Sequence, residues 1–132
     1  MGQVDEARHT RAHALRPCPQ KPNCVSSVNT EQRRFVAPLH YSGSAKAARA
    51  RLLKVLDSLK GAHVVTSDEH YIHAEFMTSI FKFVDDVELL TDENTQTIQL
   101  KSASRLGSYD FGTNRKRLNK IRDLYEEEIK AE

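Results

Sequence analysis

Apolar and polar residues alternate along most of residues 71–105, which read YIHAEFMTSIFKFVDDVELLTDENTQTIQLKSASR. This alternation is the main sequence evidence for the fold. A period of two residues is typical of a β-strand that buries one face. Ile72, Ala74 and Phe76, for example, share one face of the first strand in this stretch. Short polar turns separate the alternating segments, so consecutive strands are predicted to be antiparallel neighbours.

Four strands are predicted in all, because one more β-branched segment precedes this stretch. The polar residues 67–69 and the segment DENTQ form turns between strands. The predicted strands cover residues 62–66, 70–78, 79–90 and 97–105.

Two helices flank the predicted strands. The first spans SAKAARARLLKVLDSLKG, where Ser44 is a good N-cap and Gly61 a good C-terminal stop. The second follows a glycine-containing loop, with Asp110 or Thr113 as its cap, and has an apolar stripe at helical spacing. The order helix, four strands, helix predicts an α+β fold, a four-stranded antiparallel sheet covered by two helices.

The chain has 132 residues, a length that suits one domain with a single core. We expect residues 1–16 to form a disordered or extended tail and residues 17–132 to form a single α+β domain. Pro17, Pro19 and Pro22 stiffen the start of this domain into a proline-rich extended segment.

Composition and charge argue against several classes of protein. The net charge of +2 is too small to require a nucleic-acid partner, and NRKRLNKIR lacks neighbouring aromatic residues for base stacking. No apolar run approaches the ~20 residues of a transmembrane helix. The first 17 residues also lack the apolar core of an intact secretory signal. Nucleotide, serine-hydrolase and zinc-protease motifs do not occur, and we predict no cofactor and no metal.

Two cysteines, Cys18 and Cys24, lie at the ends of the proline-rich segment. Two thiols cannot complete a tetrahedral zinc site, and their spacing differs from that of a thioredoxin-type pair. A disulfide that closes this short loop is the preferred interpretation, and two reduced thiols are the alternative. A disulfide would imply an oxidising compartment, whereas reduced thiols would suit the cytoplasm.

Asp85 and Asp86 are adjacent in a predicted strand, where aspartate is disfavoured. Adjacent strand residues point to opposite faces, so the two carboxylates cannot share a proton or form a glycosidase pair. Asp85 is predicted to share the apolar face of Phe81, Phe83 and Val87, whereas Asp86 is predicted to be ordinary surface. A buried carboxylate such as Asp85 needs a partner, and Arg105, Arg115 and Arg117 are candidates.

A polar pocket is predicted where Asp85 meets the end of the last strand and the start of the last helix. Ser102 and Ser104 continue an apolar strand face, and the N–H groups of a helix N-terminus attract anions. The alternative interpretation of the same residues is a structural network that fixes the last helix to the sheet. The predicted binding residues are Asp85, Ser102, Ser104, Arg105, Asp110, Asn114 and Arg115.

Three functions stay open. The first is a small non-enzymatic binding module whose polar pocket takes a small anion or an acidic partner segment. The second is a hydrolase-like enzyme with Asp85 or His73 as general base, since Tyr71, His73 and Glu75 share one strand face. A solvated sheet face would look the same. The third is a subunit or scaffold of a larger complex that docks through the basic faces of its helices.

Several ordered motifs resemble the bacterial and plant family called domain of unknown function 1499. They are CPQKPNC, YIHAEF, FKFVDDVELL and KSASRLGSYDFGTNRKR, and the resemblance extends from about Pro17 into the last helix. It implies that Asp85, Ser102 to Arg105 and Asn114 to Arg117 form one constellation shared by the family. It implies no reaction. Many similar proteins carry secretory, lipoprotein or plastid-targeting leaders, which fits a bridge between the two cysteines.

Overall fold

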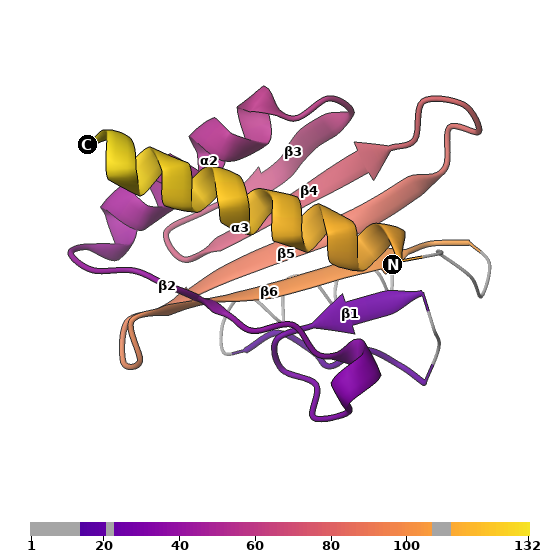
Figure 1. The fold of residues 1–132 in the computed structure, drawn as a ribbon, viewed down its shortest axis with the longest axis horizontal. Helices are drawn as coiled ribbons and strands as arrows, with labels where there is room; N and C mark the ends of the chain where they lie inside the picture. Colours follow the sequence, from indigo (N-terminus) through magenta and orange to yellow (C-terminus); the bar gives the residue numbers. More distant parts are fainter. Residues whose placement is uncertain (1–13, 21–22, 107–111) are drawn as a thin grey trace.

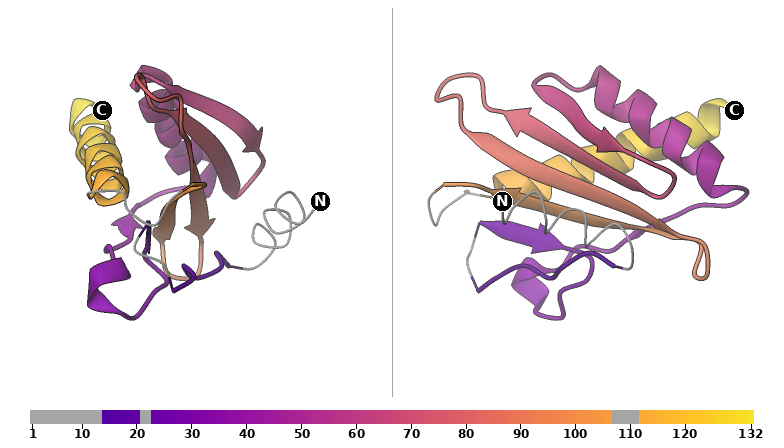
Figure 2. Two further views of the ribbon diagram at one scale, coloured as in Figure 1. Left: turned by 90° about the vertical axis from the view of Figure 1, so that its right-hand side faces the viewer. Right: turned by 180° about the vertical axis from the view of Figure 1, so that it is seen from behind.

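The computed structural model describes residues 14–20, 23–106 and 112–132. They form an antiparallel sheet that carries two helices on one face (Figure 1; Figure 2, left). The α+β architecture predicted from the sequence is thus confirmed. The strands are β1 (Cys24–Ser26), β2 (Leu39–His40), β3 (Ala62–Ser67), β4 (Tyr71–Met77), β5 (Val84–Asp92) and β6 (Thr97–Ser104).

The sheet has six strands rather than the predicted four, in the order β1-β6-β5-β4-β3, with β2 also paired to β6. The two additional strands are three and two residues long. Strands this short have no measurable period of two, so the alternation could not reveal them. Both pair with β6 and extend the sheet beyond the predicted meander.

The expected burial of Phe81 and Phe83 is wrong. β5 begins at Val84, and both phenylalanines lie in the hairpin loop before it, where they are exposed. Lys82 has a positive φ of 57°, which interrupts the extended backbone between them. The residues FKF therefore extend the alternating pattern of β5 in the sequence, but they do not belong to the strand in the structure.

The two long helices are α2 (Ala45–Ser58) and α3 (Thr113–Ala131), and a short 3₁₀ helix, η1 (Gln32–Arg34), lies between β1 and β2. Ser44 caps α2 as predicted, because its Oγ accepts the N–H of Ala47 at 3.0 Å. The N-cap of α3 is Gly112, one residue before the predicted Thr113. No helix in the described parts of the chain is both long and apolar enough to cross a membrane.

The core lies between the helices and one face of the sheet, as the stripes and alternation predict. The opposite face carries a smaller apolar cluster in which Leu15 packs with Tyr71 and Leu90. Leu15 thus contacts the sheet although it belongs to the range predicted as a tail. The largest fully buried side chains of the core are Leu39, Leu52, Leu56, Ile72, Leu89, Ile98, Leu100, Leu118, Ile121 and Tyr125.

Cys18 and Cys24 form a disulfide with a Cα–Cα distance of 5.7 Å, as preferred from the sequence. The segment before β1 is anchored further by the N–H of Cys18, which donates to Oδ1 of Asn29 at 2.7 Å. The extended conformation of the whole proline-rich segment stays a prediction, since Pro22 lies outside the described residues.

Candidate functional site

The carboxylate of Asp85 is buried beneath α3 and is only 4% exposed. Its register with Phe76 and Ser104 is unbroken, so the side chain faces the helices as the alternation predicted. Oδ2 lies 2.8 Å from Nη1 of Arg117, on the second turn of α3. The same guanidinium lies over the ring of Phe76, 4.9 Å from its centroid. Asp85 therefore has a full charge partner inside the protein.

Asn114 is the centre of the hydrogen bonds around this ion pair, and it is completely buried. Its Oδ1 accepts from Oγ of Ser102 at 2.6 Å and from Nη1 of Arg117 at 3.0 Å. Its Nδ2 donates to Oγ of Ser104 and to the carbonyl of Asn23, both at 3.0 Å. The amide thereby uses both its donors and both its acceptor lone pairs.

The structure thus brings four of the predicted site residues together: Asp85, Ser102, Ser104 and Asn114. They are joined by Arg117, which the sequence offered as a partner for Asp85 but not as a member of the binding set. The network connects β5, β6 and the segment before β1 to the first turns of α3. Its polar groups satisfy one another, which is the geometry of a structural network.

Arg105 is not part of this network, because, of the three arginines offered as partners for Asp85, it is Arg117 that forms the ion pair. Its side chain lies on the opposite face of the sheet, where Nε donates to Oδ2 of Asp86 at 2.8 Å and Nη2 to Oε2 of Glu75 at 2.6 Å. Because strand residues alternate, the residue after the inward Ser104 must point outward. Asp110, another predicted member, lies outside the described residues.

Arg115 also points away from Asp85 and binds the segment between β1 and β2. Its Nη1 and Nη2 donate to the backbone carbonyls of Phe35 at 2.8 Å and Arg33 at 2.9 Å. Arg122, two turns further along α3, binds the carbonyls of Ala37 and Pro38 in the same segment. Arg115 and Arg122 therefore attach the segment between β1 and β2 to α3.

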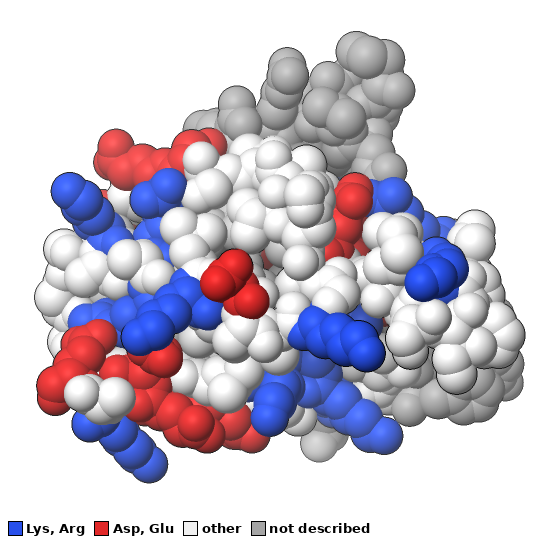
Figure 3. All heavy atoms as spheres, turned by 90° about the horizontal axis from the view of Figure 1, so that it is seen from above, with Lys and Arg blue, Asp and Glu red and all other residues white. Residues whose placement is uncertain are grey.

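Acidic residues at the end of α3 pair with basic residues of α2. Glu128 lies 3.0 Å from Nζ of Lys54, and Glu132 accepts two hydrogen bonds from Arg51. In Figure 3, acidic and basic side chains lie side by side at the end of the molecule where α3 terminates. These contacts explain why α3 is charged against its macrodipole, with bases first and acids last.

The outer face of the sheet carries a second set of polar contacts. Tyr71, His73 and Glu75 share this face as predicted, but it is not a simply solvated row. Tyr71 is buried and donates from its hydroxyl to Glu88 at 2.8 Å, and Nε2 of His73 lies 2.8 Å from Oδ1 of Asp86. Asp86, expected to be ordinary surface, has a side chain only 16% exposed.

The pKa of Asp86 reflects competing influences. Partial burial acts to raise the pKa, but hydrogen bonds from His73 and Arg105 and the charge of Arg105 outweigh it and lower the pKa to about 2. Asp86 is therefore ionised at neutral pH, and its charge is compensated by Arg105.

An open cavity of about 450 Å³ lies at the N-terminus of α2, away from all the predicted site residues. Three segments bound it: the start of α2, the β3–β4 turn and the β5–β6 turn. The hydroxyl oxygen of Ser44 already accepts the N–H of Ala47, so the N–H groups of Ala45 and Lys46 have no acceptor within the helix. The charged or titratable residues that line the cavity are Lys46, Arg49, Glu69, His70 and Glu93.

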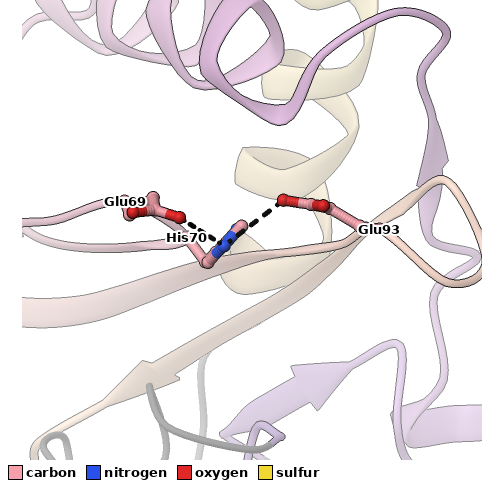
Figure 4. A group of neighbouring side chains, drawn as sticks. All are labelled: Glu69, His70 and Glu93. Atoms are coloured by element: carbon pink, nitrogen blue, oxygen red, sulfur yellow. Dashed lines mark ion pairs between the residues drawn. The ribbon is translucent and has the colours of Figure 1, made fainter.

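His70 lies between two glutamates in this cavity, as Figure 4 shows. Its Nε2 is 3.1 Å from Oε1 of Glu69 and 3.4 Å from Oε2 of Glu93. Nδ1 lies 3.0 Å from Oγ1 of Thr91, which directs its own hydroxyl proton to the carbonyl of His70. Nδ1 thus faces Thr91, and Nε2 is directed at the two carboxylates.

This arrangement favours positive charge at the outer side of His70. An ammonium group or a metal cation beside the two glutamates would compensate their charge. One ligand atom from each of Glu69, His70 and Glu93 lies within 4.8 Å of the others, so among the described residues these three could hold a cation.

The charged residues of this cavity were not predicted from the sequence. They come from two turns and a helix start that are far apart in the chain, and each is a common surface residue. Ser44 as an N-cap was the one signal, because a capped helix N-terminus marks a place where anions are favoured.

A family model described as Protein of unknown function (DUF1499) matches residues 14–124. The chain belongs to the DUF1499 family. This confirms the resemblance noted in the sequence, and the matched range contains the disulfide, the buried network and the cavity. No curated protein and no solved structure matches the chain. Within the DUF1499 fold, function must therefore be argued from the geometry of these sites.

Proposed function

We propose that this DUF1499 chain is a small non-enzymatic binding module whose site is the cavity at the N-terminus of α2. Its ligand carries a carboxylate or phosphate together with a positively charged group, either as a small molecule or as part of an acidic partner segment. The observation that carries the proposal is the pairing of basic and acidic walls in one open cavity of about 450 Å³.

The basic wall suits the anionic group of the ligand. Lys46 and Arg49 supply positive charge, and the first-turn N–H groups of α2 add donors at the positive end of the helix dipole. Nη2 of Arg49 donates to Ser67 at 2.9 Å, while its Nε is buried without a protein acceptor in the described residues. The hydrogen bond to Ser67 thus orients Arg49 at the wall of the cavity.

The acidic wall suits the positive group. Glu69 and Glu93 both face Nε2 of His70, and an ammonium group of the ligand could donate hydrogen bonds to the same two carboxylates. A bare divalent cation is less well suited, because Lys46 and Arg49 line the same cavity and repel it.

The alternatives drawn from the sequence have less geometric support. Asp85 as a general base would need access to substrate, yet it is buried and paired with Arg117. His73 directs Nε2 to Asp86. Docking through basic helix faces would need free arginines, and those of α3 at positions 115, 117 and 122 bind other parts of the chain. The disulfide supports an oxidising compartment for the module.

Three compounds of equal chain length test the proposal by calorimetric or NMR titration of the intact protein: γ-aminobutyrate, butyrate and butylamine. We expect γ-aminobutyrate to bind about fivefold more tightly than either singly charged compound, the factor for roughly 1 kcal/mol from a second ion pair. Lys46→Gln and Glu93→Gln should each remove this advantage, by acting on opposite ends of the ligand.

Lys120→Gln is the matched control, because Lys120 is an exposed lysine on α3 and the variant should bind as the parent does. Equal binding of all three compounds, or none, would overturn the proposal. Tight binding of Zn²⁺ that depends on Glu93 and abolishes γ-aminobutyrate binding would assign the cavity to a metal instead.

A further inference from the structure

The exposed apolar side chains of the described residues are concentrated at one end of the sheet. Five of the eight large ones lie there, and Ile80 and Phe81 are 81% and 70% exposed. Soluble proteins rarely leave such a group uncovered unless it contacts something. We name this group the hairpin-tip patch; it consists of Met77, Ile80, Phe81, Phe83 and Leu106.

The members of the hairpin-tip patch are neighbours in space. The rings of Phe81 and Phe83 stack with their centroids 5.4 Å apart. The N–H of Arg105 donates to the carbonyl of Val84 at 3.3 Å, which continues the β5–β6 pairing and leaves Leu106 at the same end of the sheet as the β4–β5 hairpin. The patch thus extends from the β4–β5 hairpin across to the end of β6.

The loop that presents the patch is internally hydrogen-bonded. The N–H of Thr78 donates to the carbonyl of Phe83 at 2.8 Å, and Oγ1 of Thr78 accepts the N–H of Phe83 at 2.9 Å. The N–H of Lys82 donates to the carbonyl of Thr78 at 3.2 Å. The turn is therefore closed, and the apolar side chains are held outward before any partner binds.

Shape and charge point to one kind of partner. The β4–β5 hairpin extends beyond both helices in Figure 1 and in the right panel of Figure 2, so the loop that carries Ile80 and Phe81 projects from the sheet. Lys82 at its tip is exposed, and residues 77–84 contain no acidic residue. Lys60, also exposed, precedes Gly61, whose carbonyl accepts the N–H of Met77 at 3.0 Å. Lysines therefore flank the apolar tip on two sides.

We propose that the hairpin-tip patch inserts into the interfacial region of a lipid bilayer with an anionic surface. Aromatic and aliphatic side chains at the headgroup boundary, with lysines beside the phosphates, are the usual composition of a peripheral membrane contact. A stable protein interface involves about 20 to 30 residues per partner. Five apolar side chains at the β4–β5 hairpin and the end of β6 supply only part of that, whereas a bilayer adapts to a small projection.

The chain contains no tryptophan, so Phe81→Trp introduces a single fluorescent reporter at the tip. We expect its emission to shift to shorter wavelength with vesicles of equal parts phosphatidylglycerol and phosphatidylcholine, and less with phosphatidylcholine alone. In vesicle flotation, Ile80→Ser/Phe81→Ser should reduce binding of the intact protein at least about tenfold. Lys82→Gln should weaken binding to the anionic vesicles only.

Ile129→Ser is the matched control, because Ile129 is also an exposed isoleucine but lies at the far end of α3. It should bind vesicles as the parent does, with thermal melts checking that every variant is folded. Parent protein that fails to bind anionic vesicles, or a double variant that binds them normally, would overturn the proposal. Concentration-dependent dimerisation that the double variant abolishes would assign the patch to a second copy instead.

Discussion

Asp85 on β5 and Arg117 on α3 form an ion pair of 2.8 Å in which the side chains are only 5% and 12% exposed. Arg117 also donates to Ser102 and Asn114, so a single guanidinium compensates the charge of Asp85 and connects the helix to two strands. A pair buried this deeply adds little stability over a well-packed apolar pair, but the loss of one member leaves an uncompensated charge.

Arg117→Met should therefore destabilise the protein by about 3–5 kcal/mol, because Asp85 would stay buried without its partner. Urea unfolding measures the change. The double variant Asp85→Val/Arg117→Met should be less destabilised than Arg117→Met alone, because it removes both charges. Lys120→Met, on the exposed side of the same helix, should change the unfolding free energy by less than about 0.5 kcal/mol. A double variant as unstable as the sum of its parts would show that the pair is not coupled.

The depressed pKa of Asp86 predicts a loss of stability in acid. The folded-state pKa of about 2 lies below the ordinary value of about 3.9 for an unfolded aspartate. Its contribution is therefore fully present above the unfolded pKa and is lost as the pH falls from about 4 to about 2, and amounts to about 2 kcal/mol. Asp86→Asn should flatten the dependence of the unfolding free energy on pH in this window. Asp57→Asn, at an exposed site on α2, should leave the slope unchanged.

The directions of the strand side chains were predictable because they depend on a local period of two. This placed Asp85 inward and Asp86 outward, and both placements are confirmed. The partner of Asp85 was not predictable, since three arginines were close in sequence to the end of β6 or the start of α3. Which one turns inward depends on the rotation of α3 about its axis, which is fixed by packing of its apolar stripe.

The same limit applies to features that lack a local pattern. Phe81 and Phe83 imitate a strand face in sequence, but both lie in the loop before β5, where the positive φ of Lys82 interrupts the extended backbone between them. The cavity residues, such as Arg49 and His70, come together only when two turns approach the start of α2. Period and capping therefore predict elements and faces, whereas sites built between distant segments need the folded chain.

The disulfide between Cys18 and Cys24 should stabilise the attachment of the first described segment to β1. A disulfide that closes so short a loop is expected to raise the free energy of unfolding by about 2 kcal/mol, because it reduces the conformational entropy of the unfolded chain. Reductant should lower the melting temperature of the parent protein, and Cys18→Ser/Cys24→Ser should show the lower value with or without reductant. Equal melting temperatures for parent and variant under oxidising conditions would contradict this role.

Gly61, between α2 and β3, should tolerate no side chain. Its φ of +83° is strained for any other residue, and an added Cβ would lie 2.6 Å from the carbonyl oxygen of Met77. Gly43 has nearly the same φ, +80°, but has nothing within 4 Å of an added Cβ. Gly43→Ala should therefore cost about 1 kcal/mol from the backbone alone, whereas Gly61→Ala should cost at least about 2 kcal/mol.

The difference between these two variants isolates the contact with Met77, because the backbone penalty is common to both. Urea unfolding of each variant measures it. Met77 belongs to the edge pair β3–β4, and its N–H donates to Gly61, so a shifted Gly61 would also disturb the first residue pair of that ladder. Hydrogen exchange at Met77 should accelerate in Gly61→Ala and not in Gly43→Ala. Equal destabilisation with unchanged exchange would mean that the backbone relaxes away from the clash, and that the close approach of these strands does not restrict residue 61.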